Sequence, residues 1–432
     1  MSLRGMPSAT SAGRQEQLSS RPSPSLRLRR DLLRSLRGGH PWVYRDALHP
    51  PPRLPMGSVV DLLDEGGQFV ARGLYDAASP IAFRAYTLDA QEAIDGALFR
   101  RRLRRALSLR QGLFAAAREP TDAYRWCHGE GDLLPGLVID RYGDVAVLVL
   151  DGGSDNGDAQ AAPLLHAFLP DIVAAVAELG QEFGLRAIYQ RHQRRSGGSG
   201  ELLWGSLPPA PESGKPGEII IHEHGVRFLV DIVHGQKGGL FLDQRENRLH
   251  LRRYVAGRTL WNGFSYTGGF SLHAALAGAR RVISIDRASP AIVAARRNFV
   301  LNGLDPSQHG FVAADVFQEL QAALQRGERF DIVLVDPPSF APNERSVPSA
   351  LAAYRELHRL ALSAVAPQGF LIAASCSSHV PESTFITTLV SASEATGRPL
   401  RIIETHGQPA DHPSPPAFPE GRYLKFIVLA VD

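Results

Sequence analysis

The feature that most constrains the fold is a regular alternation of apolar strands and helical segments over the second half of this 432-residue chain. From about residue 218, short apolar stretches are separated by alanine-rich segments, a pattern typical of a doubly wound parallel sheet. The last two strands are joined by a proline-rich loop, which predicts an antiparallel pair at the end of the sheet. We expect strands at 258–263, 281–286, 310–314, 330–336, 369–375, 400–405 and 423–430, with helices at 269–278, 289–302, 315–326, 350–366 and 382–396.

The first half of the chain has a different pattern. Residues 1–25 are Ser, Arg, Pro and Gly without an apolar centre, which indicates a disordered tail and no secretory signal. Short strands on either side of a Gly-rich turn within 57–76 predict a small β unit. Further strands and helices follow as far as about residue 190, and the Gly-, Ser- and Pro-dense segment 193–217 is expected to be a long loop or linker.

Composition excludes several classes of protein. The two cysteines, Cys127 and Cys376, are too few for a disulfide framework or a Cys-rich zinc site, so we expect a reducing, cytoplasmic setting and no metal. No apolar stretch reaches the roughly 18 residues of a membrane span, so we expect no membrane contact.

Positive charge is unevenly distributed. The chain has only three lysines, Lys215, Lys237 and Lys425, and its remaining basic residues are arginine, which a GC-rich genome would explain. Residues 1–125 hold 20 arginines against 12 acidic residues, and this excess favours a polyanionic partner. The basic segment FRRRLRRAL (99–107) predicts an amphipathic helix, whose arginines either contact such a partner or form a solvated face.

A ligand of such a sheet binds beyond the carboxyl ends of its strands, near the point where strand order reverses. The loop 265–269 (SYTGG) follows the first strand and opens a helix, so it is either a backbone cradle for a ligand or only a tight turn. Asp286 ends the second strand, where a carboxylate can accept both hydroxyls of a ribose or cap the next helix. Asp315 can hydrogen-bond an adenine amino group or act as a helix N-cap.

These residues carry a resemblance. The segment NGFSYTGG (262–269), Asp286, Asp315 and FDIVLVDPPSF (330–340) resemble class I S-adenosylmethionine-dependent methyltransferases. More narrowly, several stretches are similar to the bacterial 23S rRNA cytosine-5 methyltransferase family with an N-terminal PUA domain. They are HPWVYRDAL (40–48), HGEGDLLPGLVIDRYG (128–143), GQKGGLFLDQRENR (235–248), DPPSFA (336–341), AASCSS (373–378), DHP (411–413) and FPEGRYLK (418–425).

The resemblance implies an α/β fold: a PUA-like β domain at 26–95, a middle α/β domain at 96–215 and a Rossmann-like methyltransferase domain at 216–432. The cofactor is expected to be S-adenosyl-L-methionine. Its expected contacts are Phe241, Gln244, Arg245, Asn262, Phe264, Tyr266, Thr267, Gly268, Gly269, Asp286, Asp315, Asp336 and Pro337. Arg245 would lie beside its methionine part, or else form an ion pair within its own helix. The expected RNA contacts are Trp42, Arg45, Lys237 and Phe340.

The implied chemistry is methylation of C5 of cytosine, which needs a thiolate that adds to C6. Cys376 is the candidate nucleophile because it follows an apolar strand among serines; the alternative is an inert core cysteine. Asp336 would hold the base near N3, and Phe340 would stack on the extruded base or on adenine. Many RNA cytosine-5 methyltransferases have Pro-Cys after this Asp, whereas this chain has Pro337-Pro338, which implies a single-cysteine mechanism.

Several alternatives stay open at this stage. The group that removes the C5 proton is unidentified, with Lys237 or a water held by Asp336 as candidates. The enzyme could methylate another rRNA base, such as guanine, without a cysteine, or the chain could be a non-catalytic RNA-binding assembly factor. A nicotinamide oxidoreductase is disfavoured because the G-x-G-x-x-G pattern is missing. The partner is expected to be 23S rRNA, and edge-strand pairing could give a homodimer. Lys237 and Lys425 both fall in matched motifs, which suggests that these positions need an ammonium.

Overall fold

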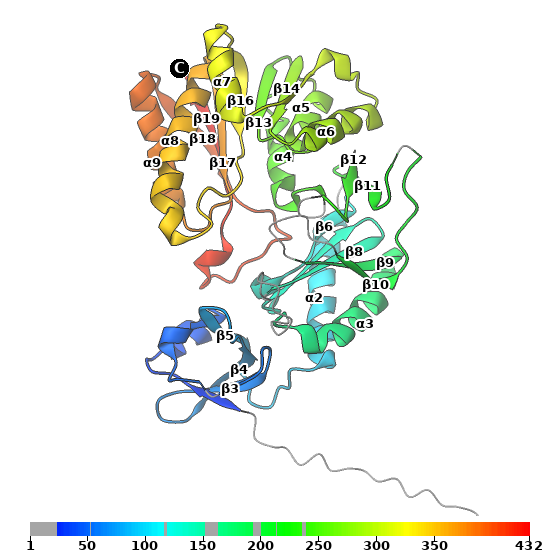
Figure 1. Ribbon diagram of the computed structural model, residues 1–432, viewed down its shortest axis with the longest axis vertical. Helices are drawn as coiled ribbons and strands as arrows, with labels where there is room; N and C mark the ends of the chain where they lie inside the picture. The colour runs from blue at the N-terminus through cyan, green and yellow to red at the C-terminus, as the bar shows by residue number, and fades with distance from the viewer. Residues whose placement is uncertain are drawn as a thin grey trace, which may run out of the picture.

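The computed structural model describes residues 24–432 except 52, 116–118, 152–162, 193–199, 213 and 236–238. Three parts follow one another along the long axis of the molecule (Figure 1). A small β part lies at one end, an α/β part lies in the middle, and the large α/β part that contains the C-terminus lies at the other end. Of the tail expected at 1–25, residues 1–23 lie outside the described residues. Ser25 begins the first strand, so the tail ends before the expected boundary.

The N-terminal part is a five-stranded sheet of order β1-β3-β4-β5-β2, in which β1 runs parallel to β3 and the other pairs are antiparallel. Its core is built from alternate strand residues such as Val60 and Leu62, which are fully buried. Its elements are β1 (Ser25–Arg27), α1 (Leu33–Arg37), β2 (Trp42–Tyr44), β3 (Val59–Leu63), β4 (Phe69–Tyr75) and β5 (Ile81–Thr87).

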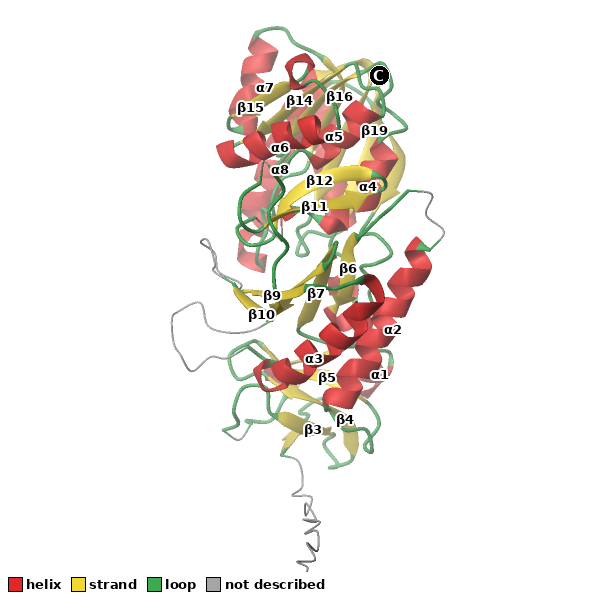
Figure 2. Cartoon of the chain, turned by 90° about the vertical axis from the view of Figure 1, so that its right-hand side faces the viewer, coloured by secondary structure: helices red, strands yellow, loops and turns green. Residues whose placement is uncertain are grey.

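The middle part is a five-stranded sheet of order β10-β9-β8-β7-β6 with two helices packed on one face (Figure 2). One of its strands, β10, lies in the segment expected to be a loop; it pairs with β9 as an edge strand, so that part of the expectation was wrong. The elements are α2 (Gly96–Phe114), β6 (Ala123–His128), β7 (Leu137–Tyr142), β8 (Val145–Leu150), α3 (Leu169–Gly180), β9 (Ala187–Arg191) and β10 (Glu201–Gly205).

The basic helix expected at 99–107 forms the first half of α2. Several of its arginines are paired with acidic residues: the Arg100 Nε donates to Glu178 at 2.7 Å, and the Arg104 Nη1 lies 3.2 Å from Glu182. Because α3 and the turn after it supply these carboxylates, the arginines hold two helices together. The guanidinium groups of Arg100 and Arg104 stay about half exposed in these ion pairs, and their contact with a polyanionic partner stays a prediction.

A hairpin of β11 (Glu218–Glu223) and β12 (Val226–Asp231) leads into the C-terminal part, whose seven-stranded sheet has the order β15-β14-β13-β16-β17-β19-β18. The strands are β13 (Thr259–Gly263), β14 (Arg281–Asp286), β15 (Gly310–Ala313), β16 (Phe330–Val335), β17 (Val365–Ser375), β18 (Leu400–His406) and β19 (Lys425–Val431). β19 is antiparallel to both β17 and β18, as expected for the final pair.

Helices cover both faces of this sheet, so its central strands are apolar on both sides. In β16, Ile332 and Leu334 pack with one cluster, and Val333 and Val335 pack with the cluster on the opposite face. The helices α5 and α6 lie on one face, and α7, α8 and α9 lie on the other (Figure 1). The helices are α4 (Arg245–Leu251), α5 (Gly269–Leu276), α6 (Ser289–Leu301), α7 (Val316–Gln325), α8 (Val347–Ala364) and α9 (Glu382–Thr396). None of the helices in the described part of the chain is long and apolar enough to cross a membrane.

Candidate active site

Strand order reverses between β13 and β16, which are neighbours in the sheet although two strands separate them in sequence. Their carboxyl ends meet at the pair Gly263 and Val335, and Val335 also pairs with Ala373 of β17. The glycine loop, Asp336 and Cys376 follow these three strand ends. The topology therefore brings the three main sequence-derived features to one edge of the sheet, where ligands of open α/β sheets bind.

The glycine loop has an unusual backbone. Phe264, Tyr266 and Gly268 have φ values of 59°, 48° and 80°, in the left-handed region that residues other than glycine rarely adopt. A Cβ on Gly268 would lie 2.8 Å from the Cβ of Ala295 in α6, so only glycine fits there. Such strain persists where the surroundings enforce it, often at binding sites.

Asp286 helps to enforce this conformation. Its Oδ2 accepts a hydrogen bond from the backbone N–H of Tyr266 at 2.9 Å, and its Oδ1 accepts from that of Ala288 at 2.8 Å. Each carboxylate oxygen has a second lone pair, so the group can still accept hydroxyl donors. Asp315 caps α7, accepting from the backbone N–H groups of Phe317 and Gln318 at 3.0 and 3.2 Å. The capping interpretation of Asp315 is therefore confirmed, and its contact with adenine stays a prediction.

Buried polar residues in and next to the loop are held by neighbouring side chains and backbone. The Asn262 Nδ2 donates to Ser271 Oγ at 2.8 Å, while its buried Oδ1 has no hydrogen-bond partner among the described residues. Thr267 is buried, and its carbonyl accepts from the Asn298 Nδ2 at 3.1 Å. Gly269 begins α5. An unsatisfied buried acceptor beside a strained loop is a feature that a bound ligand would explain.

The segment before the sheet contacts both the loop and the strand-end acid. The ring of Phe241 meets that of Tyr266 edge to face, with centroids 5.2 Å apart. The Gln244 Nε2 donates to the Asp336 Oδ2 at 3.1 Å, and Gln244 is only 3% exposed. The side chain of Gln244 thus orients the carboxylate that was expected to hold the base.

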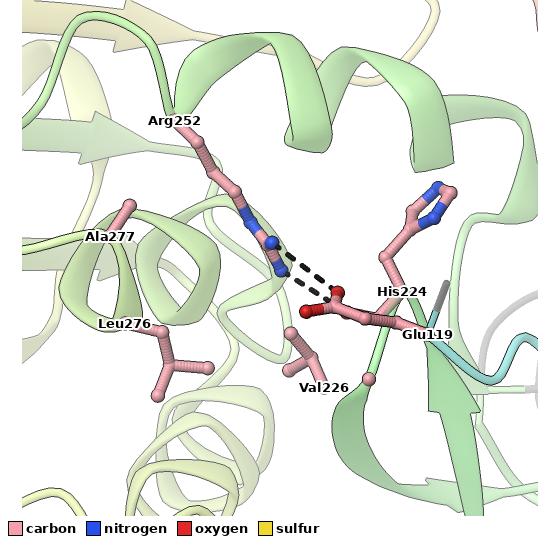
Figure 3. A pocket seen from close by; sticks show the side chains of 7 residues that line it. Glu119, His224, Val226, Arg252, Leu276 and Ala277 are labelled. Atoms are coloured by element: carbon pink, nitrogen blue, oxygen red, sulfur yellow. Dashed lines mark hydrogen bonds and ion pairs between the residues drawn. The ribbon is translucent and has the colours of Figure 1, made fainter. Parts of the chain in front are cut away.

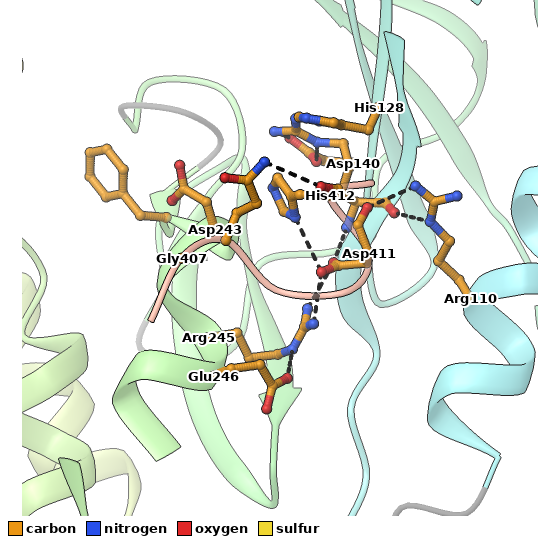
Figure 4. Close-up of polar contacts among 12 residues, drawn as sticks. Arg110, His128, Asp140, Asp243, Arg245, Glu246, Gly407, Asp411 and His412 are labelled. Carbon is orange, nitrogen blue, oxygen red and sulfur yellow. Dashed lines mark hydrogen bonds and ion pairs between the residues drawn. The ribbon is translucent and has the colours of Figure 1, made fainter. Parts of the chain in front are cut away.

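Arg245, the next residue, points elsewhere. Its Nη1 and Nη2 donate to the two carboxylate oxygens of Asp411, both at 2.8 Å, and its Nε donates to Glu246 (Figure 4). Burial alone would raise the pKa of Asp411, but the charges of His412 and Arg245 hold it well below its usual value. The ion pair accounts for Arg245, and its expected position beside the methionine part of the cofactor stays a prediction.

The Asp411 loop also contacts the middle part of the molecule. The backbone N–H of Arg125 in β6 donates to the Asp411 Oδ2 at 2.9 Å, and the Arg110 Nη2 in α2 donates to the Asp411 carbonyl at 2.7 Å (Figure 4). Arg110 is itself paired with Asp132. A buried network therefore links α2 and β6 with α4, next to the residue that orients Asp336.

Cys376 follows the last residue of β17 and is partly exposed. The serines on both sides of it, Ser375 and Ser377, are fully buried, and both hydroxyls lie within 3.0 Å of the Tyr354 hydroxyl. Phe340 packs against Tyr354, with centroids 4.9 Å apart. The position of Cys376 at an open strand end disfavours the inert core interpretation, whereas Cys127 is completely buried in the middle part.

Two residues near Cys376 were not among the expected site residues, although the sequence suggested that Lys425 needs an ammonium. Tyr423 donates to the Asp243 Oδ2 at 2.7 Å, and the Lys425 Nζ donates to the carbonyl of Ser377 at 2.6 Å. Both belong to the matched stretch FPEGRYLK. Membership of this stretch was the signal that could have identified both residues, but the sequence pattern does not indicate which side chains or carbonyls they contact.

The expected RNA contacts are mostly engaged within the protein. The Trp42 Nε1 donates to Glu130 at 2.8 Å, and its ring lies edge-on to Phe418 at 4.6 Å, so it joins the three parts. Arg45 donates to the carbonyls of Asp76 and Ser79. Lys237 lies outside the described residues. Contact of these residues and of Phe340 with RNA stays a prediction.

Two other features of the molecule lie apart from this edge. A cavity of about 270 Å³ is lined by Glu119, His224 and Arg252 among others, and none of the sequence-derived site residues lines it (Figure 3). In the described part of the chain, one group has metal-ligand residue types: His250, Glu404 and His406. The two imidazole rings stack in parallel, 12° apart with centroids 3.9 Å apart, so their in-plane lone pairs do not converge on one ion.

Known protein families match the N-terminal and C-terminal parts of the chain. Residues 26–88 match PUA-like domains, and residues 189–418 match S-adenosylmethionine-dependent methyltransferases. Ribosomal RNA large subunit methyltransferase I of Salmonella newport (strain SL254) is 38% identical over 416 residues, covering 94% of this chain and 98% of that relative. The protein of the same name from Escherichia coli O157:H7 is 38% identical over 406 residues, covering 92% and 97%.

Solved structures share the fold over nearly the whole length. A putative S-adenosylmethionine-dependent methyltransferase from Streptococcus mutans covers 94% of this chain and 100% of its own, with a TM-score of 0.80 at 23% identity. A putative methyltransferase complexed with SAH has a TM-score of 0.80 at 24% identity. The expected fold class, a methyltransferase sheet with an N-terminal PUA-like β domain and further α/β structure, is confirmed.

Proposed function

Because the chain belongs to the family of S-adenosylmethionine-dependent methyltransferases that includes ribosomal RNA large subunit methyltransferase I, we propose that it forms 5-methylcytosine in 23S rRNA. The single observation that carries the choice of base is the position of Cys376. A partly exposed cysteine lies at the carboxyl end of β17, and Asp336 lies at the end of the neighbouring strand β16, beside the glycine loop.

The proposal that the substrate is RNA is supported by the N-terminal part of the chain and by the names of its relatives. Residues 26–88 match PUA-like domains, and relatives that cover more than nine tenths of this chain carry the name of a large-subunit rRNA methyltransferase. The arginine excess of residues 1–125 suits a polyphosphate partner.

The residues at the sheet edge suit S-adenosylmethionine. The strained loop lets the backbone approach a ligand closely, the unsatisfied Asn262 Oδ1 offers an acceptor, and Asp286 keeps lone pairs for ribose hydroxyls. When bound there, S-adenosylmethionine supplies an electrophilic methyl group. Phe241 and Gln244, which contact the loop and Asp336, would border its methionine part.

In the proposed reaction the Cys376 thiolate forms a bond to C6 of the cytosine, and the electron pair of the C5–C6 double bond makes C5 nucleophilic. C5 accepts the methyl group and then loses its proton to a base. The electrons of the C5–H bond re-form the double bond as the C6–S bond breaks, which returns the thiolate. Asp336, oriented by Gln244, would share a proton with N3, which neutralises the negative charge that develops there on addition and returns to the carboxylate when the C6–S bond breaks.

The test uses the two cysteines of the chain as a matched pair. Cys376→Ala should bind S-adenosylhomocysteine normally and transfer no methyl group, whereas Cys127→Ala, at the buried cysteine of the middle part, should keep transfer. RNA that carries 5-fluorocytosine cannot release the C5 substituent, so a covalent complex should form with the wild type and with Cys127→Ala only. Normal transfer by Cys376→Ala would instead favour methylation of another base, such as guanine, without covalent catalysis.

A further inference from the structure

Lys425 is a buried ammonium with an unusual set of partners. It begins β19, is 4% exposed, and its Nζ donates to the carbonyls of Ser377 and Val380 at 2.6 and 2.9 Å. Among the residues that the structure describes, its hydrogen-bond partners are these two carbonyls, and Glu382 acts on it only as a more distant charge. Buried charges are normally paired, because an isolated charge is costly to remove from water. The surroundings of Lys425 should therefore contain another source of negative charge.

That source is next to the carbonyls that Lys425 contacts. In the pairing of β17 with β19, Ser375 lies opposite Lys425, so the ammonium meets the backbone immediately after Cys376. Burial lowers the pKa of Lys425 to about 8, and negative charge at Cys376, and to a smaller extent at Glu382, opposes that lowering. A thiolate at Cys376 is thus close enough to stabilise the ammonium, and the reverse must hold to the same degree.

Among the described residues, the other titratable groups that face this region are two tyrosines, an aspartate and an arginine. Burial raises the pKa of Tyr354 and of Tyr423, so both hydroxyls are neutral near pH 8. Asp336, at the end of β16, is an acid and disfavours a second negative charge. Arg125 acts on Tyr423 from the middle part and thus faces the same region.

We propose that Lys425 is a positioning residue, whose ammonium is the counter-ion of the Cys376 thiolate and fixes the backbone that follows it. The inference rests on the proposed role of Cys376 as the nucleophile. A thiol of ordinary pKa, about 8.5, is mostly protonated at neutral pH, and a nearby cation increases the thiolate fraction. The same ammonium also stabilises the thiolate that leaves when the C6–S bond breaks. A lysine suits this position because a compact ammonium can donate to two carbonyls while facing the sulfur.

The first test measures the rate of iodoacetamide alkylation of Cys376 against pH in the full-length protein, with the labelled cysteine identified by peptide mass spectrometry. In Lys425→Met the midpoint of the profile should rise by at least one unit, so alkylation at pH 7 should be about tenfold slower and should approach the wild-type rate at high pH. Lys215→Met, which removes a lysine outside this region, should leave the profile unchanged. Coincident profiles, or an equal change at every pH from a merely loosened loop, would overturn the proposal.

The second test leaves Lys425 in place and so does not depend on the folding of the Met variant. The chain contains only three lysines, so ¹³Cε-labelled lysine should give three resonances from which the pKa of Lys425 can be read. Cys376→Ala should lower the pKa of Lys425 from its wild-type value of about 8, because the opposing negative charge is lost. An unchanged pKa would refute the pairing. Neither test uses RNA or methyl transfer, so failure of the counter-ion role is distinguishable from failure of the proposed reaction.

Discussion

Replacement of Asp411 by asparagine tests whether the buried network holds the catalytic part against the middle part. Asp411 is completely buried and accepts two hydrogen bonds from Arg245, which is 1% exposed. Asparagine keeps the shape and one acceptor oxygen but removes the charge. Of the carboxylates that pair with Arg245 in the described part of the chain, the more exposed Glu246 then remains. Loss of one partner from a buried ion pair costs about 3–5 kcal/mol. Because Glu246 and the remaining acceptor oxygen offset part of this cost, we expect Asp411→Asn to lower the free energy of unfolding by about 3 kcal/mol.

The assay is urea unfolding at neutral pH, followed by tryptophan fluorescence. Trp126 in the middle sheet and Trp261 in β13 are both buried and report on the two parts. Asp46→Asn is the matched control, because Asp46 pairs with Arg30 on the surface, where such pairs contribute little.

A double-mutant cycle separates the ion pair from general damage at the site. Asp411→Asn combined with Arg245→Met should cost less than the sum of the two single changes, by at least 1 kcal/mol, because the second change removes the charge that the first left unpaired. A loss below 1 kcal/mol for Asp411→Asn, or costs that simply add, would refute the reasoning.

Two further predictions concern the glycine loop and a buried histidine. Gly268→Ala should weaken binding of S-adenosylhomocysteine at least tenfold by calorimetry, because its Cβ would lie 2.8 Å from an alanine of α6; Gly278→Ala, which has a similar φ of 87° but open space, should not. Burial lowers the pKa of His358 to about 3, so between pH 6.5 and 3 this histidine is protonated in the unfolded chain but not in the folded protein. The contribution of His358 to the free energy of unfolding should therefore be fully present above pH 6.5 and decrease as pH falls toward 3, by up to about 1.4 kcal/mol per pH unit. His358→Gln should flatten this pH dependence in urea unfolding measured at a series of acidic pH values.

The sequence predicts the catalytic sheet well because its strands are buried on both faces. The expected strand 281–286 and helix 382–396 coincide with β14 and α9. Strand β10 was missed because it is an edge strand in a Gly-, Ser- and Pro-rich segment, and most of its residues are exposed, so it lacks the apolar pattern. The hairpin β11–β12 was not expected because it is a separate antiparallel pair outside the seven-stranded sheet, and the alternation of strands and helices does not predict it.

Some site residues could be predicted from the sequence, and others could not. Residues at strand ends, such as Asp286, Asp336 and Cys376, are placed by the topology, because the carboxyl ends of neighbouring parallel strands share one edge. The partners of Arg245 and Lys425 depend instead on tertiary contacts. Asp411 lies 166 positions from Arg245, and a motif gives no indication that the two side chains meet.

The most direct test of the account is the identity of the methylated nucleoside. Purified protein, unmodified large-subunit rRNA and S-adenosylmethionine would be incubated together, and the RNA digested for nucleoside mass spectrometry. The account predicts that 5-methylcytidine appears with the wild type and is absent with Cys376→Ala. A methylated guanosine, or 5-methylcytidine formed equally by Cys376→Ala, would contradict it.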